Sequence, residues 1–298
     1  MIVSGQQISV AGRLIRIGRL DADKYMFIDD PAPLLSDLRN CSTRIDLFTF
    51  LQKLPQSSPK YPYPMEWDNL AAVQISSFEA WWTGQIDSKT RNMIRKAEKK
   101  GVVVREVPFS DALVKDIWAI YNECPVRQGK PFRHFGKDLA TVHKEEATYL
   151  DNSTFIGAFL GEKMIGFIKL VSDETLTQAG LMNIVSMIEH RDKAPTNALI
   201  AQAVRFCSER GIGFLVYSNF AYGKKQRDTL SDFKERNGFK RFDVPRYYVP
   251  LTSLGWAAYR LTLHRKFVDH LPLSMATKLR ELRATWHNRK LPSATEAL

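Results

Sequence analysis

The sequence has few cysteines and no long hydrophobic run. Its 298 residues include three cysteines, with no Cys-x-x-Cys pair and no Cys/His cluster. We therefore expect reduced thiols, no disulfide framework and no metal site. No run approaches the roughly eighteen apolar residues of a membrane-spanning helix. The first residues alternate polar and apolar side chains, without the apolar core of a signal peptide. These absences predict a cytoplasmic protein.

Basic residues outnumber acidic ones across the chain. There are 43 Lys and Arg against 32 Asp and Glu, which gives a formal net charge of +11. The 44% hydrophobic and 25% charged content is typical of a soluble globular protein. A net positive charge favours polyanions, such as RNA, DNA, nucleotide cofactors and acidic lipid surfaces, and does not choose among them.

Residues 1–101 predict an N-terminal α/β subdomain that ends in a basic amphipathic helix. The proline-rich stretch 55–64 predicts an extended loop. A strand is expected from Leu70, followed by one helix from about Phe78 to Lys100. Gly101 stops this helix, because glycine adopts the left-handed conformation that often ends helices. Arg91 and Arg95 lie mainly on its polar face and are weak candidates for contact with a tRNA or an acidic donor.

Residues 102–252 predict a second, larger domain with the element order β-α-α-β-β-β-α-β-α-β. A three-strand antiparallel meander and one crossover helix differ from the strict alternation of a doubly wound sheet. The pattern indicates an α/β fold with a mixed sheet. Pro195 and Thr196 open the crossover helix, whose apolar positions form a wide buried stripe.

Residues 253–298 predict an amphipathic, basic helical tail. The segment from Trp256 to Lys290 contains eight Lys and Arg residues but only two acidic residues, Asp269 and Glu281, with apolar residues interspersed. Two interpretations remain open. The helices pack on the body of the protein, or they lie on an anionic membrane surface at the inner face of the membrane.

Two segments of the second domain carry a resemblance to the GNAT acyltransferase superfamily. LSDFKERNGF, at 230–239, resembles the late helix that leads into the last strand of that fold. GEKMIGF, at 161–167, resembles its turn into the long central strand. The resemblance implies a GNAT-like fold and transfer of an acyl group from a coenzyme A thioester to an amine.

A narrower resemblance is carried by RNMIRKAEKKG, at 91–101. It is similar to a recurring segment of the Fem-like transferases, which are tandem GNAT-fold proteins that add amino acids from aminoacyl-tRNA to cell-wall precursors. NECPVRQGKPF, at 122–132, and VPRYYVPL, at 244–251, also resemble bacterial proteins encoded with surface polysaccharide genes. The resemblance implies an amino-sugar or lipid-linked acceptor.

The loop before the crossover helix bears on the cofactor. In acetyl-CoA enzymes of the superfamily it is rich in glycine, which lets backbone N–H groups approach a pyrophosphate. Here the corresponding stretch, 189–197, has no glycine. Acyl-CoA and aminoacyl-tRNA both remain candidate donors. The candidate cofactor-binding residues are His190, Arg191, Lys193, Thr196 and Asn197.

The remaining site candidates follow from the chemistry and from the GNAT layout. In the loop 127–137, cations suit a phosphate or carboxylate and His134 suits a base, although a solvated basic loop is an equal alternative. Tyr222 or Tyr217 would protonate the leaving group, although strand packing is the plainer explanation for Tyr217. Asn183 would lie beside the carbonyl. The candidate substrate-binding residues are Arg127, Gln128, Lys130, Arg133, Lys224, Arg246 and Tyr247.

These features together predict an acyl- or aminoacyltransferase that acts on an amine in cell-envelope polysaccharide or precursor synthesis. We expect direct attack of the amine, without a metal and without a covalent enzyme intermediate. The alternatives are an acetyl-CoA-dependent N-acetyltransferase and a non-catalytic GNAT-fold protein that binds RNA or a partner enzyme.

Overall fold

The computed structural model describes residues 1–21, 27–127, 129–221 and 229–265. Its main feature is an eleven-stranded mixed sheet, in the order β1-β2-β3-β4-β13-β5-β12-β11-β10-β9-β6, with a separate hairpin β7-β8. The strands are β1 (Ile2–Val3), β2 (Gln6–Ala11), β3 (Ile17–Leu20), β4 (Leu47–Leu51), β5 (Met65–Gln74), β6 (Val102–Val107), β7 (Val126–Arg127), β8 (Lys130–Pro131), β9 (Ser153–Leu160), β10 (Lys163–Ser172), β11 (Gln178–Ser186), β12 (Phe214–Val216) and β13 (Lys240–Pro250). The predicted mixed sheet is confirmed.

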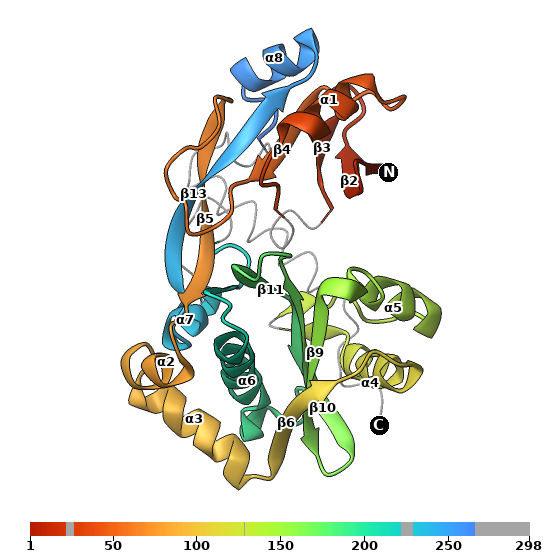
Figure 1. Ribbon diagram of the computed structural model, residues 1–298. Helices are drawn as coiled ribbons and strands as arrows, with labels where there is room; N and C mark the ends of the chain where they lie inside the picture. Colours follow the sequence, from red (N-terminus) through yellow and green to blue (C-terminus); the bar gives the residue numbers. More distant parts are fainter. Residues whose placement is uncertain (22–26, 128, 222–228, 266–298) are drawn as a thin grey trace.

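Helices pack on both sides of this sheet. They are α1 (Ala32–Asn40), α2 (Phe78–Gly84), α3 (Ser88–Lys99), α4 (Asp111–Tyr121), α5 (Leu139–Glu146), α6 (Pro195–Glu209), α7 (Thr229–Arg236) and α8 (Ser253–Arg260). Around strands β6 and β9–β11, α4 and α5 lie on one side and α6, α2 and α3 lie on the other (Figure 1). Strands β1–β4 carry α1 and α8 at the opposite end of the molecule.

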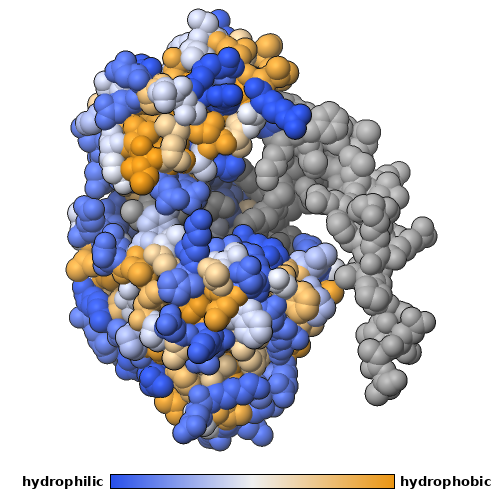
Figure 2. All heavy atoms as spheres, turned by 90° about the vertical axis from the view of Figure 1, so that its right-hand side faces the viewer, coloured by the Kyte–Doolittle hydropathy of each residue, from blue (hydrophilic) through white to orange (hydrophobic). Residues whose placement is uncertain are grey.

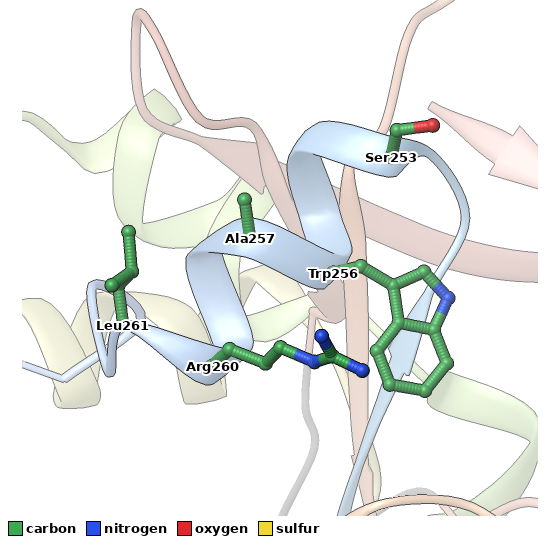
Figure 3. Close-up of a pocket in the computed structure, with 5 residues that line it drawn as sticks. All are labelled: Ser253, Trp256, Ala257, Arg260 and Leu261. Atoms are coloured by element: carbon green, nitrogen blue, oxygen red, sulfur yellow. The ribbon is translucent and has the colours of Figure 1, made fainter.

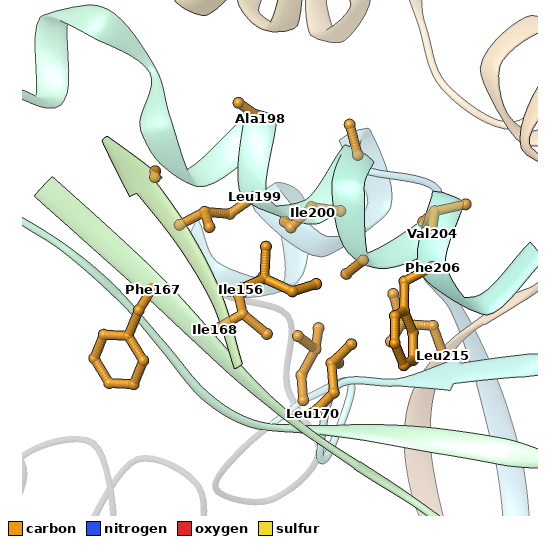
Figure 4. Packing of buried hydrophobic residues seen from close by; sticks show 14 of the residues in the cluster. Ile156, Phe167, Ile168, Leu170, Ala198, Leu199, Ile200, Val204, Phe206 and Leu215 are labelled. Atoms are coloured by element: carbon orange, nitrogen blue, oxygen red, sulfur yellow. The ribbon is translucent and has the colours of Figure 1, made fainter. Parts of the chain in front are cut away.

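Helix α6 is the centre of the larger hydrophobic core. Pro195 stands at its first position, where its missing N–H costs nothing, as the sequence predicts. Its apolar stripe, including Leu199 and Val204, is buried against side chains of β9, β10 and β12 such as Ile168 (Figure 4). Burying each such side chain stabilises the fold by about 1.5–3 kcal/mol. This packing therefore fixes the positions of these strands and of their ends.

The helix expected from Phe78 to Lys100 is instead two helices, which is a correction to the prediction. Helix α2 ends at Gly84, and α3 begins after Asp87, whose carboxylate accepts a hydrogen bond from the Thr90 N–H at 2.7 Å. Such an N-cap satisfies a backbone donor that would otherwise be unpaired, and so favours a new helix start. The predicted end at Gly101 is confirmed, because this residue has a φ of +79°.

Strand β5 begins at Met65, five residues before the predicted start, immediately after the proline-rich stretch. It lies between β12 and β13 and pairs antiparallel with both. One continuous sheet therefore crosses residue 101, where the sequence suggested a subdomain boundary. The division into subdomains remains a prediction.

Helix α8, the first part of the predicted tail, packs on the body of the protein. Gly255 lies so close to strand β4 that a Cβ there would stand 1.8 Å from the Asp46 carbonyl oxygen. The rest of the predicted tail, 266–298, lies outside the described residues. Among the residues that are described, none of the helices has the length and hydrophobicity to span a bilayer.

Candidate functional site

The parallel strands β11 and β12 separate after a short shared stretch. Their register runs from Gln178 opposite Phe214 to Gly180 opposite Val216. The chain after β12 then follows β5, because the Tyr217 N–H donates to the Ala71 carbonyl at 2.7 Å. Within the described residues, no strand pairs with this edge of β11 beyond Gly180. Ligands bind outside the carboxyl ends of adjacent parallel strands, so this divergence marks the candidate site.

A β-bulge bends β11 at the same place. Lys169 of β10 pairs with Asn183, whereas the next residue, Leu170, pairs with Leu181. Met182 is therefore the extra residue on β11. Bulges increase the local twist and are frequent next to active sites. This one lies two residues beyond Gly180, the last residue of β11 that pairs with β12.

Asn183 belongs to a buried polar network on the α4/α5 side of the sheet. Its Nδ2 donates to Glu146 Oε1 at 3.0 Å, and Tyr121 Oη donates to the same oxygen at 2.8 Å. Lys169 Nζ donates to the carbonyl oxygens of Glu146 and Thr148, both at 2.7 Å. Burial raises the pKa of Glu146 and lowers the pKa of Lys169 to about 8. The predicted role of Asn183 beside a carbonyl thus competes with a structural role.

His134 lies next to this network. It is buried, its ring stacks on Tyr121 at a centroid distance of 4.3 Å, and its Nε2 accepts from Arg133 Nε at 2.8 Å. Burial, with the positive charges of Arg133 and Lys137, lowers its pKa to about 4. A neutral imidazole with so low a pKa is a weak base at neutral pH, so the surroundings favour a structural role.

Most of the cations predicted to bind substrate contact the protein itself. Arg127 donates to the Ser186 carbonyl at 2.6 Å, to the Ile120 carbonyl at 3.0 Å and to Glu123 Oε2 at 3.0 Å. Lys130 is exposed on β8. Gln128, Lys224 and Tyr222 lie outside the described residues, so their predicted roles are not tested.

The carboxylate of Glu123 occupies the start of the loop that would hold a pyrophosphate. It accepts hydrogen bonds from the Ile188 N–H at 2.8 Å and from the Glu189 N–H at 2.9 Å. Sequence reasoning did not single out this residue. Its position depends on a contact between segments 65 residues apart in the chain, and a motif search does not reveal such a contact.

The cofactor candidates of this loop are also engaged within the protein. Lys193 pairs with Asp192 at 3.2 Å, Thr196 Oγ1 lies 2.7 Å from Ser186 Oγ, and Asn197 donates to Asn237 at 3.1 Å. His190 is buried, and its Nε2 has no hydrogen-bond partner among the described residues. Arg191 lies in the 3₁₀ turn before α6, a helix without a side-chain cap.

These residues do not fit the pyrophosphate of acyl-CoA. A pyrophosphate site needs unpaired N–H groups and close backbone approach, which glycines permit. In this loop a carboxylate already holds two N–H groups, glycines are absent, and Glu189 and Asp192 balance the charges of Arg191 and Lys193. Helix α6 points its N-terminus toward the loop, so its dipole remains a feature that favours an anion.

A second polar cluster lies at the carboxyl end of β12. Asn219 Nδ2 donates to Asp68 Oδ1 at 3.0 Å and to the Asn69 carbonyl at 2.9 Å. Arg246 Nε donates to Asp68 Oδ2 at 2.8 Å. Lys234 of α7 is buried, donates to the Asn219 carbonyl and lies 4.5 Å from the centre of the Tyr217 ring. We call Asp68, Asn219, Lys234 and Arg246 the β12 cluster.

Of these four residues, only Arg246 was a sequence candidate. Lys234 follows Phe233 in the FKERNGF segment but precedes Glu235 and Arg236, so its burial has no clear signal in the sequence. Tyr217 packs against Phe239 at 5.6 Å, which agrees with the packing alternative. Tyr247 was expected on the acceptor side but is fully buried beside β4, where its hydroxyl donates to Gln52 at 2.7 Å.

No group of three or more His, Cys, Asp or Glu side chains in the described ranges is arranged to hold a metal ion. Cys207 is buried, which raises its pKa to about 12 and makes it an inert thiol.

Comparisons with known proteins place the fold. No family model and no curated protein matches the sequence. Among solved structures, L-PGS from Bacillus licheniformis matches with a TM-score of 0.58 at 14% identity, covering 88% of this chain and 87% of that one. FemX matches with a TM-score of 0.52 at 11% identity, covering 79% and 72%.

A third similar structure is the C-terminal domain of a putative lysylphosphatidylglycerol synthetase from Agrobacterium fabrum. It has a TM-score of 0.52 at 15% identity and covers 88% of this chain and 87% of its own. Identities this low establish a common fold only. The chain shares the fold of these three structures, which agrees with the fold that the sequence resemblance implies.

Proposed function

We propose that this GNAT-fold chain transfers an acyl or aminoacyl group to an amine of a cell-envelope polysaccharide or its precursor. The observation that carries the proposal is the divergence of β11 and β12, with the β12 cluster at its open end. The shared fold with FemX and with structures named for lysylphosphatidylglycerol synthesis supports the reaction class.

Amine acylation sets three demands that the β12 cluster can meet in part. The amine must be held, the carbonyl must be polarised as an oxyanion develops, and the leaving group must receive a proton. Asp68 and Arg246 keep 20% and 11% of their side chains exposed. In our proposal Asp68 holds the acceptor amine, and Arg246 binds an anionic group of the acceptor by charge-assisted hydrogen bonds.

Lys234 acts in this scheme as a positioning residue. Its ammonium holds the Asn219 carbonyl and adds positive potential at the end of β12. A buried charge acts over a longer distance than an exposed one, because water screens it less. It thereby favours a developing oxyanion at the strand end. The leaving-group proton remains assigned to Tyr222 or Tyr217, as predicted from the fold.

We propose an aminoacyl ester, such as aminoacyl-tRNA, as the donor in preference to acyl-CoA. The poor fit of the loop before α6 to a pyrophosphate supports this choice, because Glu123 occupies its first two N–H groups. The net charge of +11 also suits a nucleic-acid donor, whose binding depends on phosphate contacts.

A label-transfer assay tests the proposal. The full chain is incubated with total tRNA charged with labelled amino acids and with amino-sugar cell-wall precursors, and the label is followed from tRNA to an amide product. In parallel, acetyl-CoA is titrated calorimetrically. Label that moves to the precursor, without acetyl-CoA binding at millimolar concentration, supports the proposal. Acetyl transfer from acetyl-CoA would overturn the donor. Charged tRNA that binds at physiological salt without transfer would indicate a non-catalytic protein.

A further inference from the structure

Exposed hydrophobic side chains are concentrated on and just after α8. Leu254, Trp256, Leu261 and Leu263 are 42%, 48%, 65% and 53% exposed. Fourteen large hydrophobic residues are exposed in the described part of the chain, and these four lie within ten consecutive positions. Isolated exposed apolar residues are ordinary, whereas a group of them marks an interaction surface.

A neighbouring loop adds a fifth hydrophobic residue and is tied to the same place. Asp46 accepts hydrogen bonds from the Arg16 N–H at 2.8 Å and from the hydroxyl of Thr252, the α8 N-cap, also at 2.8 Å. Arg44 donates to the carbonyl of Leu14, which is 84% exposed. Hydrogen bonds through Asp46 thus join the loop 12–16 to the N-terminus of α8. We call Leu14, Leu254, Trp256, Leu261 and Leu263 the α8 patch.

Arginines surround the α8 patch. The exposed arginines on its two segments and in the loop before β4 are Arg13, Arg16, Arg44, Arg260 and Arg265. Two of them are ion-paired, Arg44 with Asp46 and Arg265 with Glu66, so the net positive charge comes from Arg13, Arg16 and Arg260. The patch is thus apolar at its centre and carries net positive charge at its rim.

Trp256 and Arg260 give this surface a specific character. The Arg260 guanidinium lies 5.8 Å from the centre of the Trp256 ring, and both side chains line an open depression of about 590 Å³ on α8 (Figure 3). Hydrophobic and hydrophilic surface alternate at the end of the molecule that carries α8 (Figure 2). Leu261 lines the same depression, and tryptophan, leucine and arginine side by side are typical of surfaces that lie in a membrane interface.

We propose that the α8 patch docks on an anionic lipid surface. Trp256, Leu261 and Leu263 enter the headgroup region, and the surrounding arginines contact lipid phosphates. The positive rim supports lipid over a second copy of this chain, because two such rims would repel each other. The inference does not depend on the proposed transfer reaction, so either can fail alone.

Vesicle sedimentation with the full chain tests this proposal. Binding is compared between vesicles of phosphatidylcholine and vesicles of phosphatidylcholine mixed with phosphatidylglycerol, at low and physiological salt. The chain is expected to bind the mixed vesicles more tightly. The double change Trp256→Ala with Leu261→Ala should lower its partition coefficient about tenfold, because it removes two membrane-inserting side chains. Arg13→Gln with Arg260→Gln should lower it by a similar factor on mixed vesicles only.

Matched controls come from the opposite end of the molecule. Trp118 on α4 is 40% exposed, close to the value for Trp256, and Lys115 is an exposed cation of the same helix. Trp118→Ala and Lys115→Gln should bind vesicles as the unmodified chain does. Mixed-vesicle binding that the α8 changes leave intact would overturn the proposal. Absence of binding to the mixed vesicles would also overturn it, and a dimer in sedimentation velocity that the Trp256→Ala change dissociates would assign the patch to self-association.

Discussion

The polar groups beside the two strands that diverge at the candidate site differ in their exposure to solvent. At the α4/α5 side of β11, Glu146, Lys169 and Tyr121 are sealed from solvent, and each makes a hydrogen bond within the protein. At the end of β12, Asp68 and Arg246 are paired but partly exposed. Charges that are both buried and paired cannot reach a ligand, and removing one partner destabilises the fold. Partly exposed charges at a strand end can exchange their partners for a ligand.

The groups that a buried charge contacts indicate its role, which its residue type alone does not. Lys169 and Lys234 are both buried lysines. Lys169 donates to carbonyl oxygens at the C-terminal end of α5, where a cation interacts favourably with the helix dipole. Its role is therefore structural. Lys234 binds the loop that leaves β12, so we assign its role to the site.

The largest expected effect is on the sealed side. Glu146→Ala removes the partner of Tyr121 and Asn183 and the negative charge near Lys169. We expect the free energy of unfolding to fall by about 3–5 kcal/mol, because a buried charge is left uncompensated. Urea denaturation followed by circular dichroism measures it. A loss below about 1 kcal/mol would show that the network is not structural.

The open side is expected to respond in activity. Lys234→Met removes a buried positive charge beside β12 and should slow label transfer about 10–100-fold, less than the roughly 100–1000-fold loss of a donor that contacts the oxyanion directly. Lys240→Met is the matched control, because Lys240 is exposed on β13. Equal transfer rates for both variants would remove Lys234 from the site. Urea denaturation of both variants separates this result from unfolding.

The third expected effect is on the pH dependence of the free energy of unfolding, through His134 beside the sealed network. The pKa of His134 is about 4 in the folded protein, against an ordinary value of 6.5. Between these values the unfolded chain binds a proton that the folded protein does not, so the free energy of unfolding should fall as the pH drops from 6.5 to 4. Denaturation at several pH values should show a shallower fall for His134→Gln. Parallel curves for the two proteins would contradict the low pKa.

The smallest expected effect is that of a neighbouring carboxylate that is more exposed than Glu146. Glu145 precedes Glu146 and pairs with Lys137 at 2.5 Å, but 40% of its side chain is exposed. Glu145→Gln should cost less than about 1 kcal/mol of unfolding free energy, because solvent screens such pairs. A cost as large as that of Glu146→Ala would show that exposure does not separate the two carboxylates.

Local patterns predicted much of the fold correctly. The proline at the start of α6 and the glycine after α3 mark helix ends through backbone geometry that depends only on nearby residues. The break at Asp87 was missed because a capping residue inside a periodic stretch resembles an ordinary polar position. The start of β5 was missed because its pairing partners, β12 and β13, lie more than a hundred residues away.

The candidate site was less predictable than the fold. Arg246 was identified from its segment, but its partner Asp68 lies 178 residues away. Glu146 meets Asn183 across 37 residues, and Glu123 meets Ile188 across 65. Such contacts depend on which strands become neighbours, and one sequence does not specify this. Tyr247 illustrates the converse, because its motif suggested a ligand and its burial is structural.

Hydrogen exchange with bound charged tRNA tests the central claim most directly, namely that the ligand binds where β11 and β12 diverge. Mass spectrometry of peptides would compare exchange with and without the ligand at physiological salt. We predict slower exchange at residues 182–186 and 217–221, and unchanged exchange in α5. Protection confined to other segments, or no protection at saturating ligand, would contradict the account.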